Sequence, residues 1–127
     1  MCMRGDIYCV ELKSYEKHVQ KGKRPVLVIS NNKNNFNSPV VTVVPFTSVT
    51  KKMDLDTHVV IYKSFGLRLD SMALGEQIMP IDKSRLTEDN LIGHIDDKRL
   101  LEKIKEACIC QISWNHYKLY GKIRKDI

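Results

Sequence analysis

This 127-residue chain has no long apolar segment and no secretory signal. A membrane-spanning helix needs about 18 consecutive apolar residues, and charged residues such as Arg68 and Asp70 interrupt every candidate stretch. The N-terminus has no apolar core before Asp6, so it does not resemble a signal peptide. We therefore expect one soluble domain that stays in the cytoplasm and has no membrane partner.

Metal-binding and common catalytic motifs are also missing. The four cysteines include a Cys108-x-Cys110 pair but no C-x-x-C pair, and this spacing fits no metal site. We expect reduced thiols, with Cys9 and Cys108 as small apolar core residues. There is no phosphate-binding glycine loop, no G-x-S-x-G motif and no metalloprotease His-Glu pair. We therefore expect no metal and no cofactor.

Negative charge is in the minority. The chain has 21 Lys and Arg against 15 Asp and Glu, a formal net charge of +6. The excess is concentrated in residues 13–24 and 114–127. A basic surface favours a polyanion or an acidic protein partner. Charge alone favours a simpler interpretation, in which these segments are a solvated loop and a chain end.

Short apolar runs dominate the first half of the chain and predict β-strands. They lie at residues 7–12, 25–30, 40–46, 58–62 and 71–78. The unbroken run at 25–30 predicts burial on both faces. Pro45 has no N–H for a strand ladder, so we expect it at a strand end, an edge or a bulge. The Asn-rich residues 31–39 predict a turn-forming loop.

The second half ends in a helical pattern. From Asp96 onward, apolar residues recur every three or four positions, which predicts an amphipathic helix with Asp96 and Asp97 at its N-terminus. Residues 87–92 predict a shorter helical turn that Thr87 caps. Five or more short strands followed by one helix predict a mostly β fold, a small antiparallel barrel that the C-terminal helix closes.

A series of short motifs runs through the chain from Arg4 to about Ile112. They are R-G-D-I-Y at 4–8, G-K-R-P-V-L-V-I-S-N-N at 22–32, N-F-N-S-P at 35–39, V-P-F-T-S at 44–48, D-T-H-V at 56–59, D-S at 70–71, E-Q-I at 76–78 and I-D-K-S-R-L at 81–86. Each motif alone is weak evidence. Together, in this order and spacing, they resemble the MazF/PemK toxin family.

The resemblance implies a homodimer of small SH3-like barrels that cleaves single-stranded RNA without a metal ion and is inhibited by a cognate acidic antitoxin. It also implies that Arg24 and Thr47 are the catalytic pair. In this reaction the ribose 2′-hydroxyl attacks the adjacent phosphorus, which leaves a 2′,3′-cyclic phosphate and a 5′-hydroxyl. Because the RNA supplies the nucleophile, the enzyme mainly positions it and stabilises the phosphorane charge.

The two residue types suit that task. A guanidinium can donate two parallel hydrogen bonds to phosphate oxygens, and a threonine hydroxyl can donate a third. Arginine keeps its proton up to about pH 12, so it is a poor general base. We expect Arg24 to stabilise the dianionic transition state and to be the candidate proton donor to the leaving oxygen, while Thr47 fixes the scissile phosphate. The alternative is a strand-flanking charge and a turn hydroxyl.

Other residues in or beside these motifs are candidate RNA contacts. They are Gln20, Lys21, Lys23, Ser48, Ser71, Glu76 and Gln77. A solvated loop is the alternative for residues 20–23. In a strand, Glu76 and Gln77 would point to opposite faces, so at most one of them would face RNA.

The chain departs from the family pattern in two places. Val19 stands where many relatives carry the glutamate of a G-S-E-Q-x-G motif, so this chain cannot use that glutamate as a general base. His18 lies one residue away and is a candidate auxiliary base. Residues 114–127 form a basic, aromatic C-terminal extension after a domain at 1–113. The extension is either a platform for single-stranded RNA or a helical segment packed on the barrel.

Two other functions fit the same fold. One is a non-catalytic gyrase poison like the related CcdB-type barrels, and the other is an inactive RNA-binding domain. Arg24 and Thr47 distinguish the nuclease from the gyrase poison. An RNA cleavage assay with EDTA present decides between these two, and the inactive domain would bind RNA but leave its ends unchanged.

Overall fold

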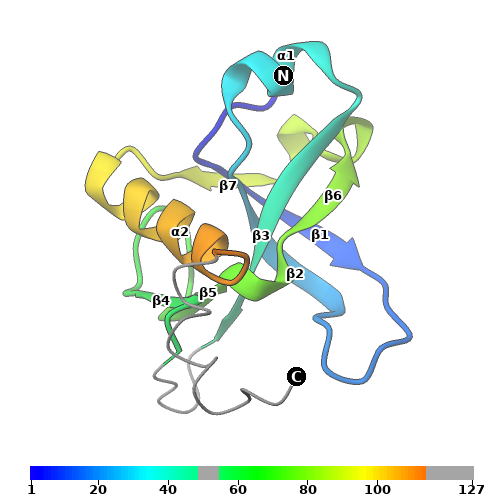
Figure 1. Cartoon of the computed structure of the whole chain (residues 1–127). Coiled ribbons are helices and arrows are strands. Elements are labelled where there is room, and N and C mark those ends of the chain that lie inside the picture. Colours follow the sequence, from blue (N-terminus) through cyan, green and yellow to red (C-terminus); the bar gives the residue numbers. More distant parts are fainter. Residues whose placement is uncertain (49–54, 114–127) are drawn as a thin grey trace.

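Figure 1 shows a computed structural model of the chain, whose structure is described for residues 1–48 and 55–113. These residues form seven strands: β1 (Asp6–Leu12), β2 (Gly22–Val28), β3 (Val40–Ser48), β4 (His58–Ile61), β5 (Ser71–Leu74), β6 (Met79–Asp82) and β7 (Leu91–His94). The helices are α1 (Asn32–Asn37) and α2 (Lys98–Cys110), with 3-10 turns η1 (Gly75–Gln77), η2 (Lys83–Arg85) and η3 (Glu88–Asn90). None of these helices is long and apolar enough to cross a membrane.

The strands form one curled antiparallel sheet in the order β4-β5-β3-β2-β1-β7, with β6 beside the first half of β3. β3 pairs with β6 through Val43 and with β5 from Phe46 onward. Pro45 lies between the residues of β3 that pair with β6 and those that pair with β5. Its missing N–H therefore removes no hydrogen bond to either of these strands. The helix α2 packs across the sheet (Figure 1). The predicted mostly β antiparallel fold with a C-terminal helix is confirmed.

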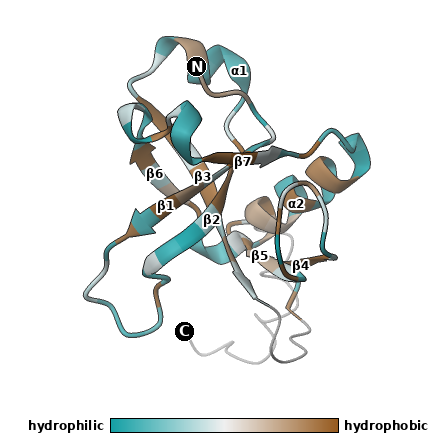
Figure 2. Cartoon of the chain, turned by 180° about the vertical axis from the view of Figure 1, so that it is seen from behind, coloured by the Kyte–Doolittle hydropathy of each residue, from teal (hydrophilic) through white to brown (hydrophobic). Residues whose placement is uncertain are grey.

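Apolar side chains fill both faces of the central strands. Val26, Leu27 and Val28 of β2 are all fully buried, as the unbroken apolar run predicted. Leu27 packs into the cluster that contains Ile104 of α2, whereas Val26 and Val28 pack into the cluster on the other face with Ile81. Figure 2 shows β2 changing from hydrophobic to hydrophilic toward its Gly22 end, where the strand leaves the core.

The predicted loop at residues 31–39 is wrong, because six of these residues form the helix α1. Asparagine side chains stabilise its N-terminal end. The Asn31 side chain accepts a hydrogen bond from the Asn34 N–H at 2.9 Å, and the buried Asn35 side chain donates to the Ser30 carbonyl at 2.8 Å. Side chains that bond locally to the backbone favour helix ends as well as turns, so composition alone did not separate the two.

The predicted strand at residues 71–78 is too long. β5 ends at Leu74, and residues 75–77 form η1. Gly75 is buried there, and a Cβ at this position would lie 2.7 Å from the Ala107 carbonyl oxygen of α2. The close approach of the helix therefore stops the strand and turns the chain.

The helical predictions at the end of the domain are confirmed. Asp97 is the N-cap of α2, and its side chain accepts from the N–H groups of Arg99 and Leu100. Thr87 caps η3, although the following residues begin β7 rather than continue the turn. Cys108 is buried as predicted, but Cys9 is only half-buried. The basic aromatic extension at residues 114–127 lies outside the described residues and stays a prediction.

Candidate functional site

A cavity of about 640 Å³ opens where β2 and β3 diverge. Its lining includes the apolar residues Pro25, Phe46 and Leu67. Its lining contains three basic side chains and one acidic side chain, which are Lys23, Arg24, Arg68 and Asp89. A concave site with an apolar floor and excess positive charge suits a ligand that carries both bases and phosphates.

Arg24 and Thr47 both line this cavity. β2 and β3 pair in antiparallel register at Val26 with Pro45, Leu27 with Val44 and Val28 with Val43. Continuing the same register by two residues brings Arg24 opposite Thr47. The recorded ladder stops before these two polar residues, and both of them line the cavity together with residues 66–69 and 89–90.

The Arg24 side chain is half-buried and oriented by the backbone. Its Nε donates a hydrogen bond to the Lys21 carbonyl oxygen at 2.7 Å. Gly22, with φ of 87°, makes the turn between these residues in a conformation that favours glycine. Arg24 makes no ion pair with a carboxylate among the described residues. Its two terminal amino groups thus keep donors for a bidentate bond to an anion.

Thr47 lies in β3 opposite Met72 of β5, so it is a strand residue and not a turn residue. Its side chain is half-buried, and its hydroxyl makes no hydrogen bond to another described residue. Ser48 is exposed at the same edge, and Ser71 faces it across the ladder. The buried Ser71 hydroxyl donates to the Leu69 carbonyl at 2.9 Å, which supports the cavity wall.

Five other sequence-predicted residues lie outside the cavity lining: His18, Gln20, Lys21, Glu76 and Gln77. Lys21 Nζ donates to the Glu16 carbonyl at 2.8 Å within the loop between β1 and β2. Glu76 Oε2 lies 2.7 Å from His58 Nε2. The argument that Glu76 and Gln77 face opposite sides of a strand is wrong, because both residues lie in η1.

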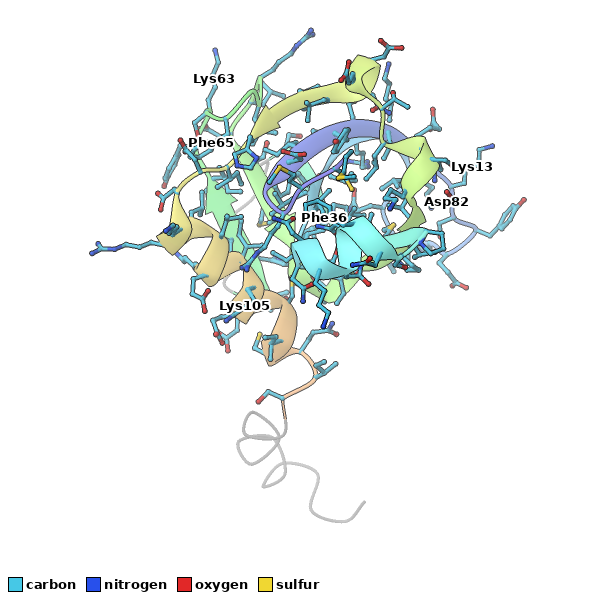
Figure 3. The ribbon with its side chains drawn as sticks, turned by 90° about the horizontal axis from the view of Figure 1, so that it is seen from above. Lys13, Phe36, Lys63, Phe65, Asp82 and Lys105 are labelled. Atoms are coloured by element: carbon cyan, nitrogen blue, oxygen red, sulfur yellow. The ribbon has the colours of Figure 1, made fainter. Side chains whose placement is uncertain are left out.

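Sequence reasoning missed Arg68 and Asp89. Arg68 belongs to the segment between β4 and β5, and Asp89 belongs to η3. The segment between β4 and β5 reaches the cavity because Phe65 and Gly66 place their backbone directly against β7. Phe65 is seen beside β7 in Figure 3. Gly66 is a sequence signal for a turn or a close backbone contact, but nothing in the sequence identified β7 as the strand that it approaches.

The R-G-D motif at residues 4–6 supports the fold. One oxygen of the Asp6 carboxylate lies 2.7 Å from His94 Nδ1, and the other accepts from the Met3 N–H at 2.8 Å and from the Tyr8 hydroxyl at 3.4 Å. Burial, reinforced by the Asp6 charge, raises the pKa of Tyr8 to about 12. The motif therefore joins the N-terminus to β1 and β7 and stands apart from the cavity.

Residues 1–48 and 55–113 contain no group of three or more His, Cys, Asp or Glu side chains that could hold a metal ion. Cys108 is poorly suited to ligation, because burial raises the pKa of its thiol to about 11.

Comparison with known proteins gives a consistent result. Residues 3–111 match the model of the PemK-like, MazF-like toxin family of type II toxin-antitoxin systems. The chain is 44% identical over 105 residues to endoribonuclease EndoA of Bacillus subtilis strain 168, covering 82% of this chain and 88% of that protein. It is 40% identical over 103 residues to endoribonuclease MazF of Staphylococcus saprophyticus, covering 80% and 84%.

Solved structures share the fold at lower identity. An endoribonuclease from a mycobacterial species, solved with its cognate antitoxin, aligns with a TM-score of 0.69 and 23% identity over 88% of this chain and 95% of that one. MazF from Deinococcus radiodurans aligns with a TM-score of 0.67 and 18% identity over 87% and 94%. The chain belongs to the PemK-like, MazF-like toxin family of type II toxin-antitoxin systems.

Proposed function

We propose that this chain is a toxin that cleaves single-stranded RNA at selected sequences without a metal ion. Two relatives at 40% identity or above, matched over most of their length, are named endoribonucleases. The observation that supports the proposal for this chain is that Arg24 and Thr47 line the same cavity, whose charged side chains are mostly basic. A gyrase poison has no need of this pair, and neither relative is named as one.

In the proposed reaction the RNA backbone enters the cavity between β2 and β3. The terminal amino groups of Arg24 donate to two non-bridging oxygens of the scissile phosphate, and the Thr47 hydroxyl donates to the same group. The ribose 2′-hydroxyl loses its proton to water as its oxygen attacks phosphorus in line, and the bond from phosphorus to the 5′-oxygen breaks. The leaving 5′-oxygen gains a proton, for which Arg24 is the candidate donor, and water then returns a proton to Arg24. Fixed donors around a site of growing negative charge lower the barrier because they need no reorganisation.

The general base of this reaction is not assigned to His18. Its side chain is exposed in the loop between β1 and β2, and it does not line the cavity. Lys23 and Arg68 do line it, so we propose that they bind flanking phosphates. Ser48, exposed at the rim, is a further candidate for contact with the RNA.

The proposal extends to partners. A net charge of +6 and a basic cavity suit an acidic antitoxin segment that competes with RNA for the same surface. We propose that the active form is a cytoplasmic homodimer, as the family resemblance implies.

The test is cleavage of single-stranded RNA by the purified protein with EDTA present, with Arg24→Ala prepared in parallel. We expect products with 2′,3′-cyclic phosphate and 5′-hydroxyl ends from the wild type only. RNA binding without cleavage would identify an inactive binding domain, and inhibition of gyrase supercoiling without cleavage would identify a gyrase poison. Either result contradicts the proposal.

A further inference from the structure

One side chain holds the loop between β1 and β2 from outside the loop. Gln77 of η1 accepts a hydrogen bond from the Gln20 backbone N–H through its Oε1 at 2.8 Å. Its Nε2 donates to the His18 carbonyl oxygen at 3.2 Å. Both polar ends of the Gln77 amide are therefore bonded to the backbone of a loop that lies more than fifty residues away in the chain.

The loop needs such an anchor. Its other contacts include the bond from Lys21 Nζ to the Glu16 carbonyl, which stays within the loop. Lys13 at its start points away from the sheet into solvent (Figure 3). Backbone without ladder bonds or buried apolar side chains opens easily. Among residues 1–48 and 55–113, the Gln77 bonds are the side-chain hydrogen bonds that join this loop to a segment other than its flanking strands.

The restrained segment leads directly to the guanidinium. Lys21 follows Gln20 in the chain, and its carbonyl oxygen accepts from Arg24 Nε at 2.7 Å. The Gln20 N–H that donates to Gln77 and the Lys21 carbonyl that accepts from Arg24 thus belong to adjacent residues. Releasing the loop from Gln77 frees the carbonyl that sets the direction of the Arg24 side chain.

The turn η1 is itself held in place by contacts with other segments. The buried Gly75 donates its N–H to the Thr57 carbonyl at 2.7 Å, and α2 packs directly against the turn. Glu76, the neighbour of Gln77, pairs with His58 of β4 at 2.7 Å. Adjacent residues of one turn therefore fasten two different segments, β4 and the loop.

We propose that Gln77 is a positioning residue that fastens the loop between β1 and β2 to η1 and thereby orients Arg24. The fastening rests on the hydrogen bonds alone, while its consequence for catalysis rests on the proposed function. This role differs from a direct RNA contact, because both polar groups of the Gln77 amide are already used within the protein.

The first experiment measures backbone amide exchange by NMR without RNA, for wild type, Gln77→Ala and Gln77→Glu. Gln111→Ala, at an exposed glutamine that ends α2, is the matched control. We expect the Gln20 amide to exchange at least about 10-fold faster in Gln77→Ala. It should keep part of its protection in Gln77→Glu, which retains an acceptor, and full protection in Gln111→Ala. Equal exchange in wild type and Gln77→Ala would overturn the fastening whether or not the protein cleaves RNA.

The second experiment separates positioning from RNA contact. We expect Gln77→Ala to lower kcat by about 10- to 100-fold with little change in KM, because misplacing a catalytic group costs rate. In an Arg24→Lys background the side chain has no Nε to bond the Lys21 carbonyl. There the Gln77→Ala change should lower kcat by less than about threefold, because Gln77 acts through that missing bond. A raised KM with unchanged kcat, or equal losses in both backgrounds, would overturn the positioning role. If the wild type cleaves no RNA, the proposed function fails while the exchange result still tests the fastening.

Discussion

Gly66 and Gly93 bring two backbone segments into direct contact. A Cβ on Gly66 would lie 2.0 Å from the Ile92 carbonyl oxygen, and a Cβ on Gly93 would lie 1.7 Å from the Phe65 carbonyl oxygen. Gly66 has a φ of 92°, so it also makes a turn that other residues rarely adopt. This contact holds the segment between β4 and β5 against β7 and completes one wall of the cavity.

Gly93→Ala should strongly destabilise the protein. The added methyl group meets backbone that cannot move without separating the two segments, and we expect a loss of about 3 kcal/mol in the free energy of unfolding. Gly22→Ala is the control: its Cβ meets no atom within 4 Å, and only its positive φ is strained. We expect that control to cost about 1 kcal/mol. Urea denaturation measures both, and equal losses would contradict the packing interpretation.

Arg24→Ala should lose RNA cleavage by at least about 100-fold, because the donors that face the transition-state charge are removed. The fold should remain, since the half-buried Arg24 side chain makes one hydrogen bond to backbone and no ion pair among the described residues. Arg24→Lys should recover little activity, because an ammonium group cannot donate in a bidentate geometry. Single-turnover rates and circular dichroism check these outcomes. Full activity in Arg24→Lys would show that charge alone is sufficient.

Thr47→Val tests the hydroxyl with little change of shape. We expect kcat to fall by about 10- to 100-fold, because one hydrogen bond to the phosphate is lost. Thr47→Ser keeps the hydroxyl and should stay within about threefold of wild type. Thermal melts of the two variants should agree, since the Thr47 hydroxyl bonds no other described residue. Wild-type activity in Thr47→Val would remove Thr47 from the mechanism.

Tyr8 should make stability fall at high pH. Its pKa is about 12 in the folded protein because of burial and the nearby Asp6 charge, whereas an unfolded tyrosine ionises near about pH 10. Between these values the unfolded chain binds fewer protons than the folded protein, so the free energy of unfolding decreases as pH rises. The contribution of Tyr8 is complete below about pH 10 and is lost by about pH 12.

Tyr8→Phe isolates this effect. Relative to wild type, the variant should gain up to about 2 kcal/mol of stability between about pH 9 and about pH 12. Cys108, whose burial raises its pKa to about 11, acts in the same direction and is present in both proteins. Denaturant titrations at several pH values measure the difference. A difference that does not change with pH would contradict this assignment.

The sequence predicted the elements whose pattern is local. Short, largely apolar runs marked β1 to β4, and the spacing after Asp96 marked α2. β6 and β7 were not predicted, because each has only four residues. Pro80 in β6 and Gly93 in β7 also interrupt a strand pattern. Family motifs indicated Arg24 and Thr47.

The rest of the site depends on tertiary contacts that no local pattern reports. Arg68 reaches the cavity through the approach of Gly66 to β7. Glu76 and Gln77 looked like strand residues, but the packing of α2 on Gly75 turns them toward His58 and the loop between β1 and β2. Hydrogen bonds between segments this far apart in the chain require the folded structure.

The central claim is that Arg24 and Thr47 hold one phosphodiester while the ribose cuts its own strand. The most direct test uses an RNA oligonucleotide with a mapped cleavage site and a second oligonucleotide with 2′-deoxyribose on the 5′ side of that bond, both with EDTA present. We expect the wild-type protein to cut the first and to leave the modified bond intact. Cleavage at the 2′-deoxy position, or cleavage that requires a divalent metal, would contradict the claim.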